Sequence, residues 1–185
     1  MKILITGRPG VGKTTLFSRV VSELRRSYST AGFVCPEVRE SGTRIGFKVI
    51  DLMSGYEGWL AMSIDRLGSC RGPRIGRYCV LEDEVGRVMA RTRASLPTAS
   101  IIAIDEIGPM ELNIKSSKEI IDLAISMDKP GIFVVHYRLA GEITSKLKSS
   151  GTNYKLYTVD PVNRDRLYSE ILSLALRIVG GYKQI

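Results

Sequence analysis

One eight-residue segment near the N-terminus constrains the fold more than any other part of the chain. It matches the pattern G-x-x-x-x-G-K-[ST] at every fixed position and consists of Gly7, Arg8, Pro9, Gly10, Val11, Gly12, Lys13 and Thr14. The segment follows the short apolar stretch of residues 2–6 and precedes apolar residues at helical spacing from 13 to 24. A strand, a glycine-rich loop and a helix in this order predict a phosphate-binding P-loop.

Each part of this loop has a chemical task. Glycines let the loop curl, so that successive backbone N–H groups point at phosphate oxygens, and the following helix adds its positive dipole end. Lys13 is expected to reach the β- and γ-phosphates, and the Thr14 hydroxyl is expected to ligate Mg²⁺. A glycine-rich turn that binds nothing is the alternative. It is disfavoured because the flanking strand and helix agree with the full pattern.

The rest of the chain alternates apolar strands with amphipathic helices. Further strands are predicted at 101–104, 132–135 and 154–159, and helices at 81–96, 116–127, 140–147 and from 160 to a stop at Gly180-Gly181. Extended stretches at 32–39 and 44–52, joined by residues 40–43, predict an antiparallel hairpin. The segment 55–77 shows little periodicity and is expected to be a surface loop or part of a site. The pattern predicts an α/β sandwich around a mostly parallel sheet, formed by one domain spanning residues 1–185.

A pair of carboxylates follows the predicted buried strand at 101–104. Asp105 and Glu106 occupy the position at which a P-loop protein places its Walker B aspartate. Asp105 is expected to hold Mg²⁺ through water, and Glu106 to orient and deprotonate the attacking water. A solvated acidic turn or an ion-pair partner for an arginine is the alternative for Glu106. The reserve candidates for the base are Glu111 and, less favoured, Glu37 and Glu40.

Arginines are concentrated between residues 66 and 93, which contain seven Arg and no Lys. A loop bearing Arg71, Arg74 and Arg77 could supply transition-state charge at the γ-phosphate as an arginine finger, or these residues could form a solvated basic face. His136 follows the predicted strand at 132–135 and is a candidate γ-phosphate contact or a satisfied structural residue. Three aromatic residues are candidates for stacking on a base, although packing is the commoner role: Tyr56, Trp59 and Tyr137.

Charge and composition narrow the class of partner. The 185 residues carry a formal net charge of +8, which favours anionic partners, either free nucleotides or nucleic acid. The sequence has no apolar run of the roughly 18 to 20 residues that a membrane span needs, and Met1 leads straight into a strand-like stretch, so a cytoplasmic protein is expected. The cysteines have no C-x-x-C spacing and are expected to be reduced packing or loop residues: Cys35, Cys70 and Cys79.

Several motifs together resemble the thermophilic-type nucleoside-triphosphatase family. Besides the P-loop, they are the stretches 37–40 and 44–52, 75–78, 105–112, 135–138 and 162–165. The resemblance covers nearly the whole chain, and the R-I-G-F-K and D-E-I-G-x-M-E-L stretches are its most diagnostic parts. It implies a three-layer α/β/α P-loop fold that is RecA-like. It also implies Mg²⁺-dependent hydrolysis of ATP, GTP, CTP and UTP to NDP and phosphate with little base preference.

The same resemblance distributes nucleotide contacts over two segments. One is the P-loop, and the other comprises Ile101, Ile102, Ala103, Ile104, Asp105, Glu106, Ile107 and Gly108. Pro109 stands where some relatives are expected to carry a lysine, so no phosphate contact is assigned to it.

Three other functions are compatible with a P-loop. A nucleic-acid-linked ATPase would use the positive charge to grip a phosphate backbone, but the sequence has no basic-aromatic motif to support it. A small-molecule kinase would transfer the phosphoryl group to another acceptor, whereas the glutamate beside Asp105 suits water and no inserted lid domain is evident. A regulatory GTPase with strict GTP selectivity would need an N-K-x-D segment, which is absent from the sequence. Nucleoside triphosphates are therefore the favoured partners, and the oligomeric state is not predicted.

Overall fold

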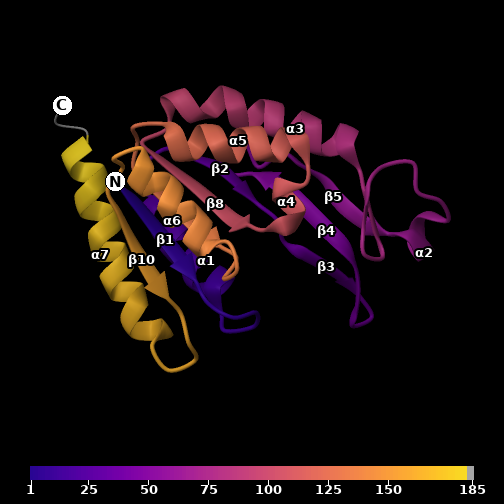
Figure 1. The fold of residues 1–185 in the computed structure, drawn as a ribbon, viewed down its shortest axis with the longest axis horizontal. Helices are drawn as coiled ribbons and strands as arrows, with labels where there is room; N and C mark the ends of the chain where they lie inside the picture. Colours follow the sequence, from indigo (N-terminus) through magenta and orange to yellow (C-terminus); the bar gives the residue numbers. More distant parts are fainter. Residues whose placement is uncertain (183–185) are drawn as a thin grey trace.

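The structure is a computed structural model that describes residues 1–182, and its framework is one mixed β-sheet (Figure 1). Within these residues the sheet has ten strands in the order β10-β1-β9-β8-β2-β4-β5-β7-β6, with β3 paired to β4. The parallel half contains β10 (Tyr154–Thr158), β1 (Lys2–Thr6), β9 (Gly131–Val135), β8 (Ile101–Ile107) and β2 (Thr30–Val34). The antiparallel half contains β3 (Glu37–Glu40), β4 (Thr43–Asp51), β5 (Glu57–Ser63), β6 (Arg74–Ile75) and β7 (Tyr78–Val80).

Helices cover both faces of this sheet. One face packs against α1 (Lys13–Leu24) and α7 (Arg164–Tyr182), whose apolar residues share one hydrophobic cluster. The other face packs against α3 (Glu82–Ser95), α5 (Lys115–Ser126) and α6 (Ala140–Ser149), which belong to a second cluster. The remaining helices are short: α2 (Ile64–Leu67), α4 (Pro109–Leu112) and the 3₁₀ turn η1 (Leu96–Thr98).

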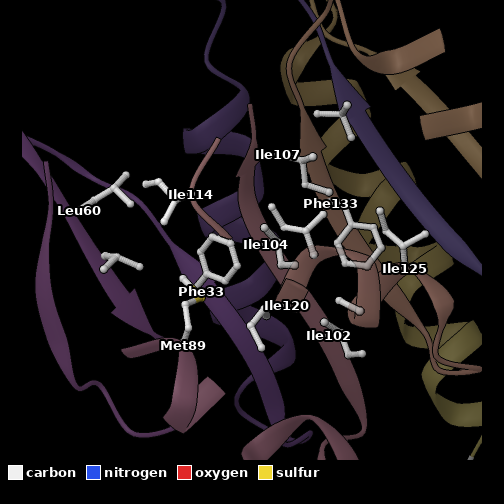
Figure 2. Packing of buried hydrophobic residues seen from close by; sticks show 14 of the residues in the cluster. Phe33, Leu60, Met89, Ile102, Ile104, Ile107, Ile114, Ile120, Ile125 and Phe133 are labelled. Atoms are coloured by element: carbon white, nitrogen blue, oxygen red, sulfur yellow. The ribbon is translucent and has the colours of Figure 1, made fainter. Parts of the chain in front are cut away.

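The central strands are buried on both faces, as their continuous apolar sequences predict. In β8, Ile101 and Ala103 belong to the cluster with α1 and α7, whereas Ile102 and Ile104 belong to the cluster with α3 and α5. Figure 2 shows Ile104 between Phe33 and Phe133, with side chains from the covering helices packed around them. The two clusters confirm the predicted three-layer α/β/α sandwich with a parallel core and an antiparallel hairpin.

Several parallel strands end at the same edge of the sheet, and backbone hydrogen bonds tie these ends together. The Val159 N–H donates to the Thr6 carbonyl at 2.7 Å, which joins the ends of β10 and β1. The His136 N–H donates to Ile107 at 3.0 Å, and the Cys35 N–H donates to Asp105 at 2.8 Å. The loops after β1, β8, β9 and β10 therefore emerge from one firmly held edge, where ligands bind in open α/β sheets.

The antiparallel half is larger than the predicted hairpin. The expected first arm, 32–39, divides at Pro36 into β2, which pairs in parallel with β8, and β3, which pairs with β4. Proline has no N–H to donate to a continuous ladder, which accounts for the break. The expected loop at 55–77 contains β5, whose Leu60 and Ala61 are fully buried against the core. Gly58 and Ser63 obscure this strand in the sequence because neither is typical of strands.

Two other predictions are wrong. Helix α7 continues through Gly180 and Gly181 to Tyr182 instead of stopping at the two glycines. Cys70 and Cys79 form a disulfide with a Cα–Cα separation of 5.6 Å, so only Cys35 among the three cysteines is free. Cys70 lies in the loop between α2 and β6, and Cys79 lies on β7, so the fold brings together residues that have no motif spacing.

Among the described helices, none is both long enough and apolar enough to span a membrane.

Candidate active site

The P-loop occupies the turn between β1 and α1, as predicted. Gly7, Gly10 and Gly12 have φ values of 148°, 80° and 93°, in the region that favours glycine, and Gly12 caps α1 in a left-handed conformation. The Lys13 side chain is buried, and its ammonium donates to the Arg8 carbonyl across the loop at 3.4 Å. Thr14 is exposed at the first turn of the helix. The loop thus presents a lysine and a hydroxyl at the positive end of α1.

The acidic pair lies at the end of β8, beside this loop. Asp105 is only 5% exposed, and Oδ1 of its carboxyl has no hydrogen-bond partner among the described residues. Burial raises the pKa of Asp105 to about 6; the Glu106 charge also raises it, whereas Thr14 and Lys13 lower it. The peptide bond between Asp105 and Glu106 is cis.

The orphaned Asp105 oxygen fits a bound divalent cation. Mg²⁺ prefers oxygen donors and is usually held by one or two protein groups together with water and substrate phosphates. The partnerless Oδ1 of this buried carboxylate and the Thr14 hydroxyl, whose hydrogen bond lowers the pKa of the same carboxyl, supply such donors. No group of three or more His, Cys, Asp or Glu within residues 1–182 could hold a metal by itself. These residues therefore suit a metal that arrives with a phosphate ligand.

A cavity of about 330 Å³ brings several predicted residues together. It is lined by Pro9, Gly10, Gly12, Lys13, Thr14, Glu106 and His136. His136 follows β9, and its Nδ1 accepts a 3.4 Å hydrogen bond from the Arg138 N–H. A second cavity of about 210 Å³ shares Thr14 and Glu106 with the first and is also lined by Cys35, Phe47, Asp105, Gly108, Pro109, Met110 and Glu111. Glu106 therefore lines both the phosphate-loop cavity and the carboxylate-rich one.

Glu111, the reserve candidate for the base, lies on the short helix α4 and is 7% exposed. Its pKa is raised to about 7: burial is the largest cause and the charges of Glu106 and Asp105 add to it, whereas hydrogen bonds from the backbone N–H groups of Glu111 and Gly108 act in the opposite direction. A Cβ on Gly108 would lie 2.8 Å from Glu111 Oε2. The carboxyl therefore braces the turn that follows Glu106.

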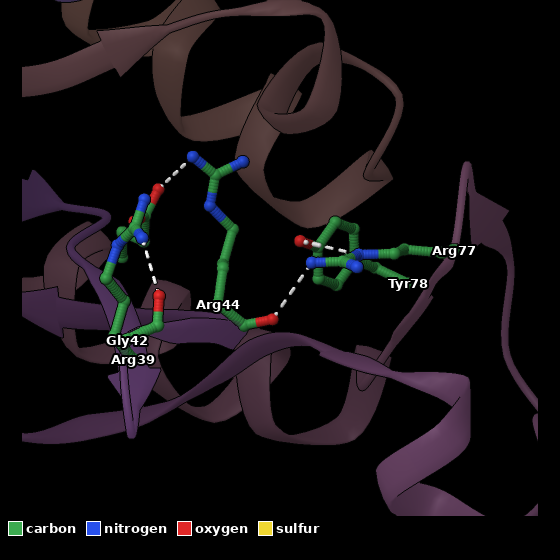
Figure 3. Close-up of polar contacts among 6 residues, drawn as sticks. Arg39, Gly42, Arg44, Arg77 and Tyr78 are labelled. Carbon is green, nitrogen blue, oxygen red and sulfur yellow. Dashed lines mark hydrogen bonds and ion pairs between the residues drawn. The ribbon is translucent and has the colours of Figure 1, made fainter.

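The three candidate arginines do not line the phosphate-loop cavity. Figure 3 shows the Arg77 guanidinium donating to the Arg44 carbonyl and to the Tyr78 hydroxyl, each at 3.1 Å. Tyr78 meets the Phe47 ring edge-on at 5.3 Å, and Phe47 lines the carboxylate-rich cavity. Arg74 is exposed on β6, and Arg71 lines a separate cavity of about 380 Å³. Arg77 itself lines another cavity, of about 210 Å³, together with Arg44 and Arg66. The contribution of the three arginines to phosphate binding stays a prediction.

Other candidates have structural partners. Glu37 pairs with Arg39 and Arg44, and Glu40 pairs with Arg66 at 2.9 Å. The side chains of residues 101–104 are buried in the two hydrophobic clusters, so only the end of β8 faces the cavity. The aromatic candidates also pack against neighbours. Arg91 Cζ lies 4.2 Å from the centroid of the Tyr56 ring, and Lys48 Nζ lies 6.0 Å from the centroid of the Trp59 ring. The ring centroids of Tyr137 and His136 are 4.6 Å apart.

The turn after β10, for which the sequence motifs predict no role, lies against the P-loop. A Cβ on Gly7 would lie 2.5 Å from the Val159 carbonyl oxygen, and a Cβ on Gly12 would lie 2.9 Å from Arg164 Cδ and Nη1. The predicted strand at 154–159 offered a signal for this contact, because a strand parallel to β1 ends at the same edge.

Comparison with known proteins gives a consistent family. The sequence model of a protein family described as NTPase matches residues 2–172 of this chain. The nucleoside-triphosphatase THEP1 of Hyperthermus butylicus is 42% identical over 186 residues, which cover 99% of this chain and 95% of the relative. The THEP1 of Saccharolobus solfataricus is 38% identical over 177 residues, which cover 95% of this chain and 93% of the relative.

Two solved structures share the fold. The crystal structure of THEP1 from Aquifex aeolicus matches with a TM-score of 0.72 and 28% identity, covering 95% of this chain and 99% of that one. The solution structure of a human cancer-related nucleoside triphosphatase matches with a TM-score of 0.69 and 27% identity, covering 94% and 96% of the two chains.

Proposed function

The chain belongs to the THEP1 family of nucleoside-triphosphatases, which are P-loop hydrolases, and from this premise we propose that it hydrolyses ATP, GTP, CTP and UTP, with Mg²⁺, to the diphosphate and phosphate. The observation that carries the proposal is the cavity of about 330 Å³ shared by the P-loop and Glu106. Its lining combines an anion-binding loop, a lysine and a carboxylate, which is the set that phosphoryl transfer to water needs.

Lys13 and the backbone of the P-loop bind the phosphate chain in this mechanism. The Lys13 ammonium, now bonded to the Arg8 carbonyl, exchanges that partner for β- and γ-phosphate oxygens and offsets the charge that develops on the leaving group. Bound Mg²⁺ would be held by Thr14 and Asp105 and would neutralise phosphate charge.

Glu106 orients a water in line with the γ-phosphate and accepts its proton. The glutamate lines the cavity opposite the loop and has no side-chain hydrogen bond or ion pair with other described residues, so its carboxylate is available to a water molecule. His136 lines the same cavity and is proposed as a γ-phosphate contact. Of the candidate arginines, Arg77 is proposed to act at the γ-phosphate, because Tyr78 and Phe47 connect it to the neighbouring cavity.

Phosphate release tests this function directly. Purified protein would be assayed with each of the four triphosphates and Mg²⁺, alone and with RNA, DNA or nucleoside acceptors, and Lys13→Ala would serve as the inactive control. We expect similar basal turnover of all four nucleotides and none in Lys13→Ala. Release that requires nucleic acid, or transfer to an acceptor in place of water, would contradict a stand-alone triphosphatase.

The arginine proposal has a paired test on the same assay. Arg77→Ala should lower kcat by at least about tenfold if its charge reaches the transition state, and Arg74→Ala, on the exposed edge strand, is the matched comparison. Equal kcat in both variants would assign the arginine cluster to the solvated surface.

A further inference from the structure

The turn between β10 and α7, residues 159–163, lies directly beside the P-loop. In Figure 1 this golden connection and the indigo loop after β1 emerge from the same edge of the sheet. The contact is close. A Cβ atom on Gly7 would lie only 2.5 Å from the Val159 carbonyl oxygen, and a Cβ atom on Gly12 would lie only 2.9 Å from the Arg164 side chain. The salt bridge between Arg19 and Asp165, at 3.1 Å, further ties α1 to the start of α7.

The polar groups of this turn are used by the turn itself. Asp160 Oδ1 accepts the N–H groups of Val162 and Asn163, each at 2.8 Å. The Asn163 amide donates to Asp160 Oδ2 and to the Thr158 carbonyl, each at 3.0 Å, while its oxygen accepts the Asp160 N–H at 3.0 Å. The side chains that could distinguish base edges by hydrogen bonds are therefore occupied.

The hydrogen bonds of the turn do not use the side chains of Val162 and Arg164. Val162 is 94% exposed, and Arg164 is partly buried without a side-chain hydrogen bond or ion pair to any described residue. The Arg164 guanidinium takes the space of a side chain on Gly12, and it does not line the cavity that holds Lys13 and Glu106. It therefore lies directly against the P-loop, within reach of a nucleotide held there.

The strand order fixes the direction in which a nucleotide must extend. Glu106 lies near the end of β8, which is beyond β9 on one side of β1, whereas the turn of residues 159–163 follows β10 on the other side and leads directly to Arg164. Adjacent strands are about 4.8 Å apart, so a triphosphate whose γ-phosphate faces Glu106 spans β1 and directs its nucleoside towards β10.

We propose that Arg164 and Val162 form the nucleoside subsite, with the Arg164 guanidinium against the face of the base and Val162 covering its edge. Every base has a π-face, so such contact binds all four bases without reading their hydrogen-bonding edges. The inference rests on the proposed function, because it names the side chains that would give that reaction its low base selectivity.

Equilibrium binding of reaction products tests the subsite without requiring turnover. Dissociation constants would be measured by calorimetry for Mg²⁺ complexes of ADP, GDP, CDP and UDP, and for Mg²⁺-pyrophosphate, which lacks a nucleoside. Arg164→Ala should weaken all four diphosphates about tenfold and leave pyrophosphate unchanged. Val162→Ala, at a fully solvated position, should weaken the diphosphates by a smaller factor and keeps the test valid if Arg164→Ala does not fold.

Two further variants separate the alternatives. Arg164→Lys retains the charge but lacks the planar face, so diphosphate binding should remain weakened. Arg166→Ala, an exposed arginine on the same helix, should bind like the wild type. Equal weakening of pyrophosphate, full recovery in Arg164→Lys or unchanged diphosphate binding in Arg164→Ala would each overturn the subsite. Failure of the wild type to hydrolyse triphosphates would instead overturn the proposed function. The binding constants would still show whether Arg164 contacts the nucleoside.

Discussion

At the scale of single residues, the site owes its character to carboxyl groups in unequal surroundings. Asp105 and Glu111 are both nearly inaccessible, and burial raises the pKa of each, whereas Glu106 between them is partly exposed to the cavity. A solvent-accessible carboxylate such as Glu106 is suited to act as a general base towards water. A buried carboxylate with an unpartnered oxygen, such as Asp105, is suited to bind a metal ion. The difference in burial therefore agrees with the separate roles predicted for Asp105 and Glu106 from their positions in the sequence.

The raised pKa of Glu111 predicts a dependence of stability on pH. Its folded pKa is about 7 against an ordinary 4.5, so between these values the unfolded state binds fewer protons and the free energy of unfolding falls as pH rises. Glu111→Gln should reduce this slope and increase the free energy of unfolding at pH 8 by about 3 kcal/mol.

Urea unfolding of both proteins from pH 4.5 to 8 without Mg²⁺ checks this expectation. Glu119→Gln, on the exposed side of α5, should keep the wild-type slope. Identical slopes in wild type and Glu111→Gln would show that the carboxyl is not held in its neutral form.

At the scale of elements, a buried lysine joins β1 to the end of α5. The Lys2 ammonium donates to the carbonyls of Ala124, Met127 and Lys129 at 3.0, 2.9 and 2.9 Å. The Ala124 carbonyl belongs to the last turn of α5, where a helix leaves carbonyls without intrahelical partners, and the other two lie in the turn that follows. The strand that leads into the P-loop is thereby anchored at its start.

Replacing this lysine should cost stability. Lys2→Met fills the same space but removes three donors, so we expect a loss of about 3 kcal/mol in the free energy of unfolding. Lys118→Met, on the exposed face of α5, should change it by less than about 1 kcal/mol because its ion pair is solvated. Chemical denaturation measures both, and similar losses in the two variants would contradict an anchoring role for Lys2.

The disulfide belongs to the same scale, because it fastens the loop after α2 to β7. Protein unfolded without reductant should show one reactive thiol, from Cys35, and three after reduction. Thiol titration in denaturant counts them, and three thiols before reduction would contradict the bond.

Removing a native disulfide costs about 2 to 5 kcal/mol in small domains, so Cys70→Ser should lower the unfolding midpoint.

At the scale of the whole molecule, the sheet has a predictable half and a less predictable half. The parallel strands are apolar runs buried on both faces, and the alternation of strands with amphipathic helices fixes their class, so the sandwich could be predicted from the sequence. Strand β5 and the end of α7 could not, because glycines interrupt both and burial in the assembled core decides whether the element continues. The Cys70–Cys79 pair likewise depends on the antiparallel pairing of β6 and β7.

The candidate site divides in the same way. The P-loop and the acidic pair are each a continuous stretch of sequence, so each could be recognised as a motif. The structure places Lys13, Thr14 and Glu106 on one cavity, together with His136, which follows the neighbouring strand β9. The strand predicted at 154–159 indicates only that the turn after it reaches this edge, whereas the packing of the Arg164 side chain on Gly12 depends on the folded geometry and could not be predicted. The family supplies the activity, and the roles of individual residues follow from this geometry.

The most direct test of the mechanism is a single-turnover experiment on Glu106→Gln. Excess enzyme, Mg²⁺ and labelled ATP would be mixed, and bound ATP and released phosphate would be followed together, with Glu119→Gln as the matched control. We expect Glu106→Gln to bind ATP as tightly as the wild type while the cleavage step slows at least about 100-fold. Cleavage at the wild-type rate in Glu106→Gln would show that Glu106 takes no part in the chemistry.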